Sequence, residues 1–335
     1  SRVVLFVLGV MLLNPLHAET VLKIATLAPD STSWMKIMRE GADEIEQQTQ
    51  GRVKIKFYPG GVMGNDKVVL RKIRVGQLHG GALMSGSLAA IYPDAQLYSL
   101  PFLFKNIEEI NYVRKHMDAV IRDGLEQNGL VGLGLINGGF AYIASTGPAA
   151  NLQDIRRQKV WLPQGDKVGA TMFKAADISP VPLPISDVYT ALQTGLLDTV
   201  VSNPSSIIAF QWHTKVQYMT DAPIVFLIGM LVVDKKIFDK LSVDDRQTVR
   251  SVMGEKSLKL DSLSQRDNEA ALQVLRDNGI KFLASTEEEQ TSWSNIAAST
   301  WSQLQEKGAY TSRNFGLLRK YLDAYRNGKV ALHDK

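Results

Sequence analysis

The chain has 335 residues, of which 45% are hydrophobic and 21% are charged, and its formal net charge is +4. These proportions are ordinary for a globular protein, and the length suffices for two domains of common size. No basic cluster is interleaved with aromatic residues, which argues against nucleic acid as a partner. The sequence contains no cysteine, which excludes disulfides, thiol catalysis and cysteine metal sites.

Residues 1–18 have the pattern of a secretory signal peptide. Val3–Leu13 is an apolar run too short to span a membrane, and the small-residue exit at Leu16-His17-Ala18 follows it. The alternative is a buried strand, but no polar residue alternates within the run. We therefore expect cleavage after Ala18 and export to a bacterial periplasm.

The sequence after Thr20 alternates strand and helix patterns up to about Asn137. Short apolar or alternating runs predict the strands, and amphipathic runs behind cap residues predict the helices. The expected strands are Val21–Thr26, Arg52–Phe57, Gly80–Met84 and Leu130–Ile136. The expected helices run from the caps at Ser31–Ser33 to about Gln48, from Asn65 to Gly76, and from Asn106 to about Asn128.

The segment Lys159–Pro204 repeats this alternation over a shorter length. Gly195 stands where a C-terminal glycine ends a helix. The order of elements is typical of βαβ units with a parallel sheet, which binds ligands at the carboxyl ends of its strands. The expected elements are a strand at Lys159–Leu162, a helix at Val168–Ala176, a strand at Ile178–Leu183, a helix at Val188–Leu192, and a strand that ends at Asn203-Pro204.

The last third of the sequence predicts one long strand and one long helix. Ile224–Val233 is an apolar strand that we expect to cross back to the first α/β unit. Ser242 caps a helical pattern that reaches toward Asn278 and would be on the order of 50 Å long. One lobe is too small for such a helix, so it is expected to bridge two. A strand at Ile280–Ala284 and helices around Trp293–Leu304 and Phe315–Tyr325 follow.

Several blocks carry a resemblance to a known family. The chain reads Lys159-Val160-Trp161-Leu162-Pro163, then Pro182-Leu183 with SDVYTALQTGLLD at 186–198, then Ser202-Asn203-Pro204. These blocks resemble K-I-R-V-P, P-L-x-E-V-Y-x-A-L-Q-x-G-x-x-D and E-N-P. Those patterns are typical of the dicarboxylate-binding type of substrate-binding protein in tripartite ATP-independent periplasmic (TRAP) transporters. Leu22–Thr26, Gly51–Ile55 and Leu100–Phe104 match further blocks of that family.

The resemblance implies an α/β fold of the type II-like periplasmic binding proteins, with two lobes, hinge strands and a long helix across both. The first lobe would comprise residues 19–140 with about 230–270, and the second would comprise residues 141–229 with about 271–335. A small organic solute would bind between the lobes and pass to the membrane permease subunits of the transporter. The resemblance implies neither a cofactor nor a metal.

The chain departs from the family at the position that holds the substrate. The family places an arginine at the position of Trp161, and many members place a second in a turn where this chain has Ala141. An arginine matches a carboxylate because its guanidinium is a planar, permanent fork of donors. A buried carboxylate without such a partner costs several kcal/mol. The loss of both arginines predicts an uncharged, zwitterionic, cationic or mainly apolar ligand instead of a dicarboxylate.

The ligand-binding candidates are aromatic or amide residues near the expected cleft. Trp161 is either a cleft wall or a core tryptophan, and the resemblance favours the cleft because the replaced arginine points there. Asn203 matches the ligand-contacting asparagine of the family, with a turn-forming role before Pro204 as the alternative. Trp34 is a cleft residue or the first core residue of its helix. The full set is Ser33, Trp34, Phe140, Tyr142, Trp161, Asn203, Gln211 and Trp212.

Three other functions compete with a TRAP receptor for a neutral ligand. A monocarboxylate receptor would hold the anion with another base, such as Lys167 or Arg157. A receptor of similar shape could serve an ATP-driven importer or a sensor kinase. An exported enzyme is disfavoured because the sequence shows no nucleophile elbow, no paired histidines at ligand spacing and no acid–base set. No catalytic residue is therefore predicted.

Overall fold

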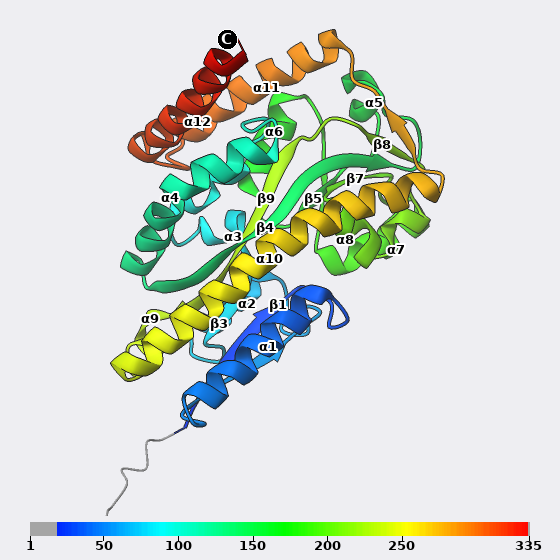
Figure 1. Ribbon diagram of the computed structural model, residues 1–335. Helices are drawn as coiled ribbons and strands as arrows, with labels where there is room; N and C mark the ends of the chain where they lie inside the picture. The colour runs from blue at the N-terminus through cyan, green and yellow to red at the C-terminus, as the bar shows by residue number, and fades with distance from the viewer. Residues whose placement is uncertain (1–18, 334–335) are drawn as a thin grey trace, which may run out of the picture.

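The computed structural model describes residues 19–333, so the predicted signal peptide lies outside the described part. The chain forms a mixed α/β fold in which long strands run through the middle and helices lie on both sides (Figure 1). This is the predicted fold class. The strands are β1 (Thr20–Thr26), β2 (Val53–Tyr58), β3 (Gly80–Met84), β4 (Leu130–Ser145), β5 (Trp161–Pro163), β6 (Val181–Leu183), β7 (Thr199–Ser202), β8 (Tyr218–Thr220), β9 (Val225–Asp234) and β10 (Lys281–Leu283).

The helices begin where the sequence offers side-chain caps. Thr32, Asn65 and Asn106 each accept a hydrogen bond from the backbone N–H three residues on. Within residues 19–333 no helix is both long and apolar enough to cross a membrane. The helices are α1 (Ser33–Gln48), α2 (Asp66–Arg74), α3 (Ser85–Leu88), α4 (Ile107–Gln127), α5 (Leu152–Arg156), α6 (Lys167–Ala175), α7 (Val188–Thr194), α8 (Pro204–Ala209), α9 (Lys235–Phe238), α10 (Val243–Asp277), α11 (Glu287–Glu306) and α12 (Ser312–His333).

The main sheet has the order β10-β8-β4-β9-β3-β1-β2, with β7 also paired to β4. β1 pairs in parallel with β2 and β3, while β9 runs antiparallel between β3 and β4. This confirms that the apolar strand β9 returns to the first α/β unit. β5 and β6 form a parallel pair, as the order of elements predicted, but this pair is separate from the main sheet, and β7 pairs antiparallel with β4.

β4 is the strand that passes from one part of the sheet to the other. Its first part pairs with β9, and its last residues pair with β7 and β8. The expected end at Ile136 was wrong, because a register shift between Asn137 and Gly139 carries the strand onward to Ser145. Gly139 has φ +84, and an added Cβ there would lie 2.6 Å from Asn268 Nδ2, so the bulge requires glycine.

The long helix α10 spans both parts of the molecule, as predicted. Its 35 residues begin after Ser242, whose side chain accepts a hydrogen bond from Asp245 N. It packs against α1, β4 and α8, and Figure 1 shows it crossing in front of the central strands. The N-terminal half of α10 therefore contacts the first α/β unit and the C-terminal half contacts the second.

The buried apolar residues form clusters on either side of the strands. One cluster joins β3, α4 and β9 to Leu304, Leu318 and Leu322 of the C-terminal helices. A second packs α1 and α10 onto β1, β4 and β9, and two more surround β5, α6, α7 and β7. Because α12 packs on α4, the C-terminal segment contacts the first unit. The proposed boundary assigned that segment to the second lobe, and where the lobes divide stays a prediction.

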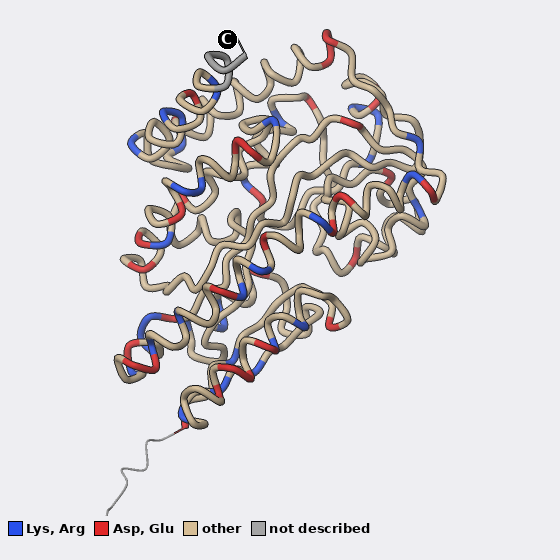
Figure 2. Tube along the Cα trace, in the orientation of Figure 1, with Lys and Arg blue, Asp and Glu red and all other residues tan. Residues whose placement is uncertain are grey.

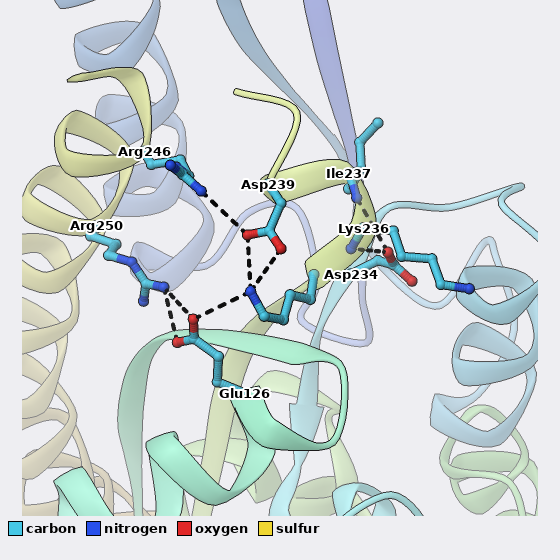
Figure 3. Close-up of polar contacts among 8 residues, drawn as sticks. Glu126, Asp234, Lys236, Ile237, Asp239, Arg246 and Arg250 are labelled. Carbon is cyan, nitrogen blue, oxygen red and sulfur yellow. Dashed lines mark hydrogen bonds and ion pairs between the residues drawn. The ribbon is translucent and has the colours of Figure 1, made fainter. Parts of the chain in front are cut away.

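Charged residues lie along the helices, and the central strands carry almost none (Figure 2). Near the start of β4 and the end of β9, Arg250 donates to both carboxylate oxygens of Glu126 at 2.9 Å. Lys235 bonds to Asp239 at 2.7 Å, and this hydrogen bond lowers the pKa of the Asp239 carboxyl. Lys235 also lies 3.9 Å from Glu126, and Arg246 lies 3.5 Å from Asp239, so these contacts connect α4, α9 and α10 (Figure 3).

Candidate ligand-binding site

A cavity of about 680 Å³ lies at the carboxyl ends of four strands. Its wall includes Thr26 at the end of β1, Met84 at the end of β3, Pro163 of β5 and Ser202 of β7. Small-molecule sites occupy roughly 300–1,000 Å³, and α/β sheets bind their ligands at these strand ends. The cavity is therefore the candidate site for a solute.

Trp161 of β5 lines the cavity and is also nearly buried, with 4% of its surface exposed. Its Nε1 donates a hydrogen bond to the carbonyl oxygen of Leu183 at 2.9 Å. Its ring meets that of Trp212 edge to face, with centroids 5.3 Å apart. Trp161 is therefore both a core residue, since it is almost fully buried, and a residue of the cavity wall. The indole can offer a ligand apolar ring surface, whereas its single N–H donor is already used within the protein.

A second aromatic side chain in the wall comes from the end of α8. Phe210 lines the cavity, and Trp212 stacks on it with centroids 5.4 Å apart. Trp212 is fully buried and is not part of the wall. Its contacts with Phe210 and Trp161 place it behind both rings, where it fixes their positions.

Asn203 caps α8 and lies in the cavity wall. Its Oδ1 accepts from Ser206 N at 2.8 Å, and its Nδ2 donates to the carbonyl oxygen of Gly138 in the β4 bulge. Asn268 of α10 donates to the same carbonyl at 3.2 Å. The bulge, α8 and α10 are therefore tied together beside the cavity. Asn203 thus forms the turn before Pro204, as the alternative predicted, and it also lies in the cavity wall. Contact with a ligand stays a prediction.

The charged side chains in the wall are mainly acidic. Among the described residues, the cavity is lined by three aspartates (Asp66, Asp166 and Asp267), by Lys67 and by no arginine. Asp66 accepts from Met84 N at 2.9 Å, and Asp166 accepts from Gly169 N at 2.9 Å as the cap of α6. Burial raises the pKa of both the Asp66 and the Asp166 carboxyl. The wall thus already disfavours further negative charge.

Ala141, where the resemblance predicts a second arginine, does not reach the cavity. Ala141 is fully buried in β4, where its carbonyl oxygen accepts from Ile224 N at 2.8 Å, and it is not part of the wall. Neither Lys167 nor Arg157, the alternative bases, lines the cavity. Arg157 is paired with Asp154, and 73% of its side chain is exposed.

One hydrogen bond joins the two sides of the cavity wall at an exposed place. Asn65, the cap of α2, donates through Nδ2 to Oε1 of Gln164 at 3.0 Å. Gln164 follows β5 directly, and both residues line the cavity. The α2 side and the β5 side therefore touch across the opening in this structure.

The structure brings four of the eight predicted site residues to the cavity, namely Ser33, Trp34, Trp161 and Asn203. Trp34 is half-buried and also packs against the core of α1 and α10. The other four candidates are not part of the wall. Phe140 packs on Phe226, Tyr142 is half-buried in β4, Gln211 is exposed and Trp212 is buried. Burial raises the pKa of the Tyr142 hydroxyl.

Sequence reasoning did not select several residues that do line the cavity. Phe210 directly precedes the selected Gln211, and the strand-then-helix pattern could have found it only with the register of α8 known. Ser205 and Asn268 are ordinary polar residues of helices. No local pattern distinguishes them from solvent-exposed ones. Asp66 and Asp166 were recognisable as residues at helix starts but not as cavity residues.

Comparison with known proteins places the chain in a family. The model of the bacterial extracellular solute-binding proteins, family 7 (DctP), matches residues 24–308. The chain belongs to this family. It is 26% identical over 312 residues to the C4-dicarboxylate-binding periplasmic protein DctP of Rhodobacter capsulatus, covering 91% of this chain and 92% of that one. The TRAP resemblance seen in the sequence is thereby confirmed.

Solved structures of TRAP periplasmic solute-binding proteins share the fold. One from Citrobacter koseri, with bound D-glucuronate, has a TM-score of 0.81 at 23% identity and covers 91% of this chain and 99% of its own. Another, from Desulfovibrio salexigens with bound orotic acid, has a TM-score of 0.83 at 16% identity, with coverages of 91% and 99%. The two-lobed architecture is therefore shared, and the family is one of solute receptors.

Proposed function

We propose that this receptor works in the periplasm, after cleavage behind Ala18, and delivers a small organic solute to the permease subunits of a TRAP transporter. The family match and the periplasmic relative support this assignment. Ligand would bind in the cavity between the lobes and stabilise the closed arrangement, because a ligand shifts the equilibrium toward the state it contacts best. In this proposal the protein is not an enzyme.

The proposed ligand is uncharged, zwitterionic, cationic or mainly apolar. The observation that carries this proposal is the composition of the wall, in which no arginine occurs among the described residues and Trp161 occupies the β5 position. A dicarboxylate would bring negative charge to a wall whose aspartates already have raised pKa values. Lys67, the one basic side chain among the described residues of the wall, can pair with only one of the two carboxylates, and leaving the other unpaired costs several kcal/mol.

The proposed roles of the site residues follow from their positions. Trp161, Trp34 and Phe210 supply flat apolar surface, against which a ring or an alkyl group would pack. Ser33 and Asn203 supply polar groups at the edge of that surface. Of the four candidates outside the wall, Trp212 acts by holding Trp161 and Phe210 in place. Phe140, Tyr142 and Gln211 lie outside the wall, and a role for them in binding stays a prediction.

Matched pairs of acids and neutral compounds test the ligand class. Orotate is uracil with one added carboxylate. D-glucuronate differs from D-glucose in carrying a carboxylate at C6 in place of a hydroxymethyl group. Thermal-shift measurements with each pair, and with succinate, malate and sialic acid, compare the two classes directly. We expect the neutral members to stabilise the protein more than the acids. Clear stabilisation by succinate, malate or sialic acid, and by no neutral compound, would contradict the proposal.

A monocarboxylate receptor is the second candidate function, and Lys67 is the observation that favours it. Lys67 is the one basic side chain among the described residues of the wall, and it is exposed at the start of α2. Replacing Lys67 by alanine would abolish the binding of a monocarboxylate and leave that of a neutral ligand unchanged. Lys167→Ala is the matched control, because Lys167 lies outside the wall.

A further inference from the structure

Ser205 carries a polar atom that the protein itself does not satisfy. Its Oγ is shielded from solvent and makes no hydrogen bond with any described residue. Ser205 is also part of the cavity wall. A hydroxyl that is removed from water without a partner costs about 1–3 kcal/mol, so proteins rarely leave one in this state.

The groups around Ser205 are already paired with one another. The backbone N–H of Ser205 donates to Oδ1 of Asn268 at 3.2 Å, and Asn268 donates to the Gly138 carbonyl. Asn203 uses its amide for Ser206 N and for the same carbonyl. The Ser205 hydroxyl is therefore the unpaired member of a polar group whose other hydrogen bonds lie within the protein.

We propose that Ser205 Oγ binds a neutral hydroxyl, carbonyl or amide group of the ligand at the part of the cavity next to the β4 bulge. This inference rests on the proposed receptor function and names one contact within it. The partner is neutral because the hydrogen-bonded groups that hold this part of α8, namely two amide side chains and a backbone carbonyl, carry no charge. An anion at this position would be desolvated without a counter-charge.

The same contact connects the ligand to the framework between the lobes. Ser205 lies in α8, Asn268 in α10 and Gly138 in the β4 bulge, and these three elements meet at this hydrogen-bonded group. A ligand that bonds to Ser205 would therefore add a hydrogen bond to the group that holds α8 and α10 to the strand. We expect the bond to contribute to affinity and not to the stability of the free protein.

The experiment compares Ser205→Ala with the wild type, using the pooled small-molecule fraction of a bacterial cell extract as the probe. Each protein is incubated with this fraction, desalted, and examined by native mass spectrometry for a retained compound. Titration of that compound into each protein then gives its affinity. We expect Ser205→Ala to weaken binding about fivefold to tenfold, as loss of one neutral hydrogen bond does. The melting temperature of the free protein should stay unchanged or rise.

Controls separate a ligand contact from a structural one. Ser257→Ala removes a buried hydroxyl of α10 that donates to Met253 O at 2.8 Å and lies outside the wall, so it should lower the melting temperature and leave affinity unchanged. Ser205→Thr keeps the hydroxyl and should retain more affinity than the alanine variant. Equal affinity of wild type and Ser205→Ala, or a lower melting temperature of free Ser205→Ala, would overturn the inference. If the wild type retains no compound, the receptor proposal itself fails and this inference fails with it.

Discussion

Two regions of this receptor differ in whether they contain a buried arginine: the contact between α4 and α10 does, and the described part of the cavity wall does not. Where α4 meets α10, Arg114 is 8% exposed and its guanidinium pairs with Asp118 at 3.1 Å and with Asp261 at 2.9 Å. In the cavity wall, Asp66 and Asp166 accept hydrogen bonds from backbone N–H groups, and Trp161 lies where the family resemblance predicts an arginine. The chain therefore buries a guanidinium where two carboxylates neutralise it, and the cavity offers no such arrangement.

The Arg114 cluster also supports the strand beside the cavity. Asp261 accepts from the backbone N–H of Asn137 at 2.8 Å, directly before the β4 bulge. Arg114 thus orients a carboxylate that holds the bulge, and it has no position in the wall. The buried guanidinium of Arg114 therefore serves the framework, while the cavity wall carries aromatic rings, neutral polar groups and aspartates.

The largest expected effect is that of removing the framework arginine. Arg114→Met removes the guanidinium that neutralises the partly buried carboxylates of Asp118 and Asp261, and we expect a loss of about 3–5 kcal/mol in the free energy of unfolding. Urea denaturation measures it. The control is Arg157→Met, whose exposed ion pair should contribute less than about 1 kcal/mol. Equal losses for the two variants would show that the buried cluster is not a special support.

The next effect comes from placing the family's arginine in the wall. Trp161→Arg removes the hydrogen bond to Leu183 O and the contact with Trp212, so we expect the free protein to lose about 2–4 kcal/mol. Succinate should then stabilise the variant more than it stabilises the wild type, because a guanidinium pairs with a carboxylate. Thermal unfolding with and without succinate tests this. No gain with succinate would mean that position 161 does not set ligand charge.

A smaller effect depends on pH and tests the acidic side of the comparison. Burial raises the pKa of Asp166 in the folded protein, so the folded state binds the proton more tightly than the unfolded state. Stability should therefore fall as pH rises from the ordinary aspartate pKa of about 4 toward the raised value. Asp166→Asn keeps the cap of α6 and removes this dependence. Parallel stability curves for the two proteins across that range would contradict the prediction.

The smallest effect is expected at the contact between Asn65 and Gln164. Asn65→Ala removes an exposed hydrogen bond across the opening, which contributes about 0.5–1 kcal/mol or less, and it also removes the cap of α2. Gln164→Ala removes the same bond and leaves the cap, so it isolates the contact. Fluorescence resonance energy transfer between labels on α2 and α6 should show a larger open fraction in Gln164→Ala. An unchanged fraction would mean that the contact does not hold the lobes together.

Much of the fold was predictable because its signals are local. The caps Thr32, Asn65 and Ser242 stand at the helix starts, and the apolar run of β9 marks a strand whose second half is buried on both faces. The length of β4 was not predictable, since the bulge at Gly139 depends on its tertiary contact with Asn268. The spacing of apolar residues shows where a strand begins. It does not show whether pairing with a neighbouring strand continues past a β-bulge.

The candidate site was predictable only in part, for a related reason. The residues that reached the wall, such as Trp161 and Asn203, lie at strand ends that the βαβ order fixes. Gln211 and Trp212 follow the end of α8 by two and three residues, and the direction of each side chain depends on the left-handed conformation at Gln211. Ser205 becomes significant only through the absence of a partner for its Oγ among the described residues, which no sequence pattern records.

The charge of the natural ligand tests the central claim most directly. Native mass spectrometry of the receptor purified from the periplasm of its own host would detect a retained small molecule, and its mass and fragmentation would give its ionisable groups. We predict an uncharged, zwitterionic or cationic compound with a ring or apolar part and at least one hydroxyl, carbonyl or amide group. A retained dicarboxylate would contradict the account.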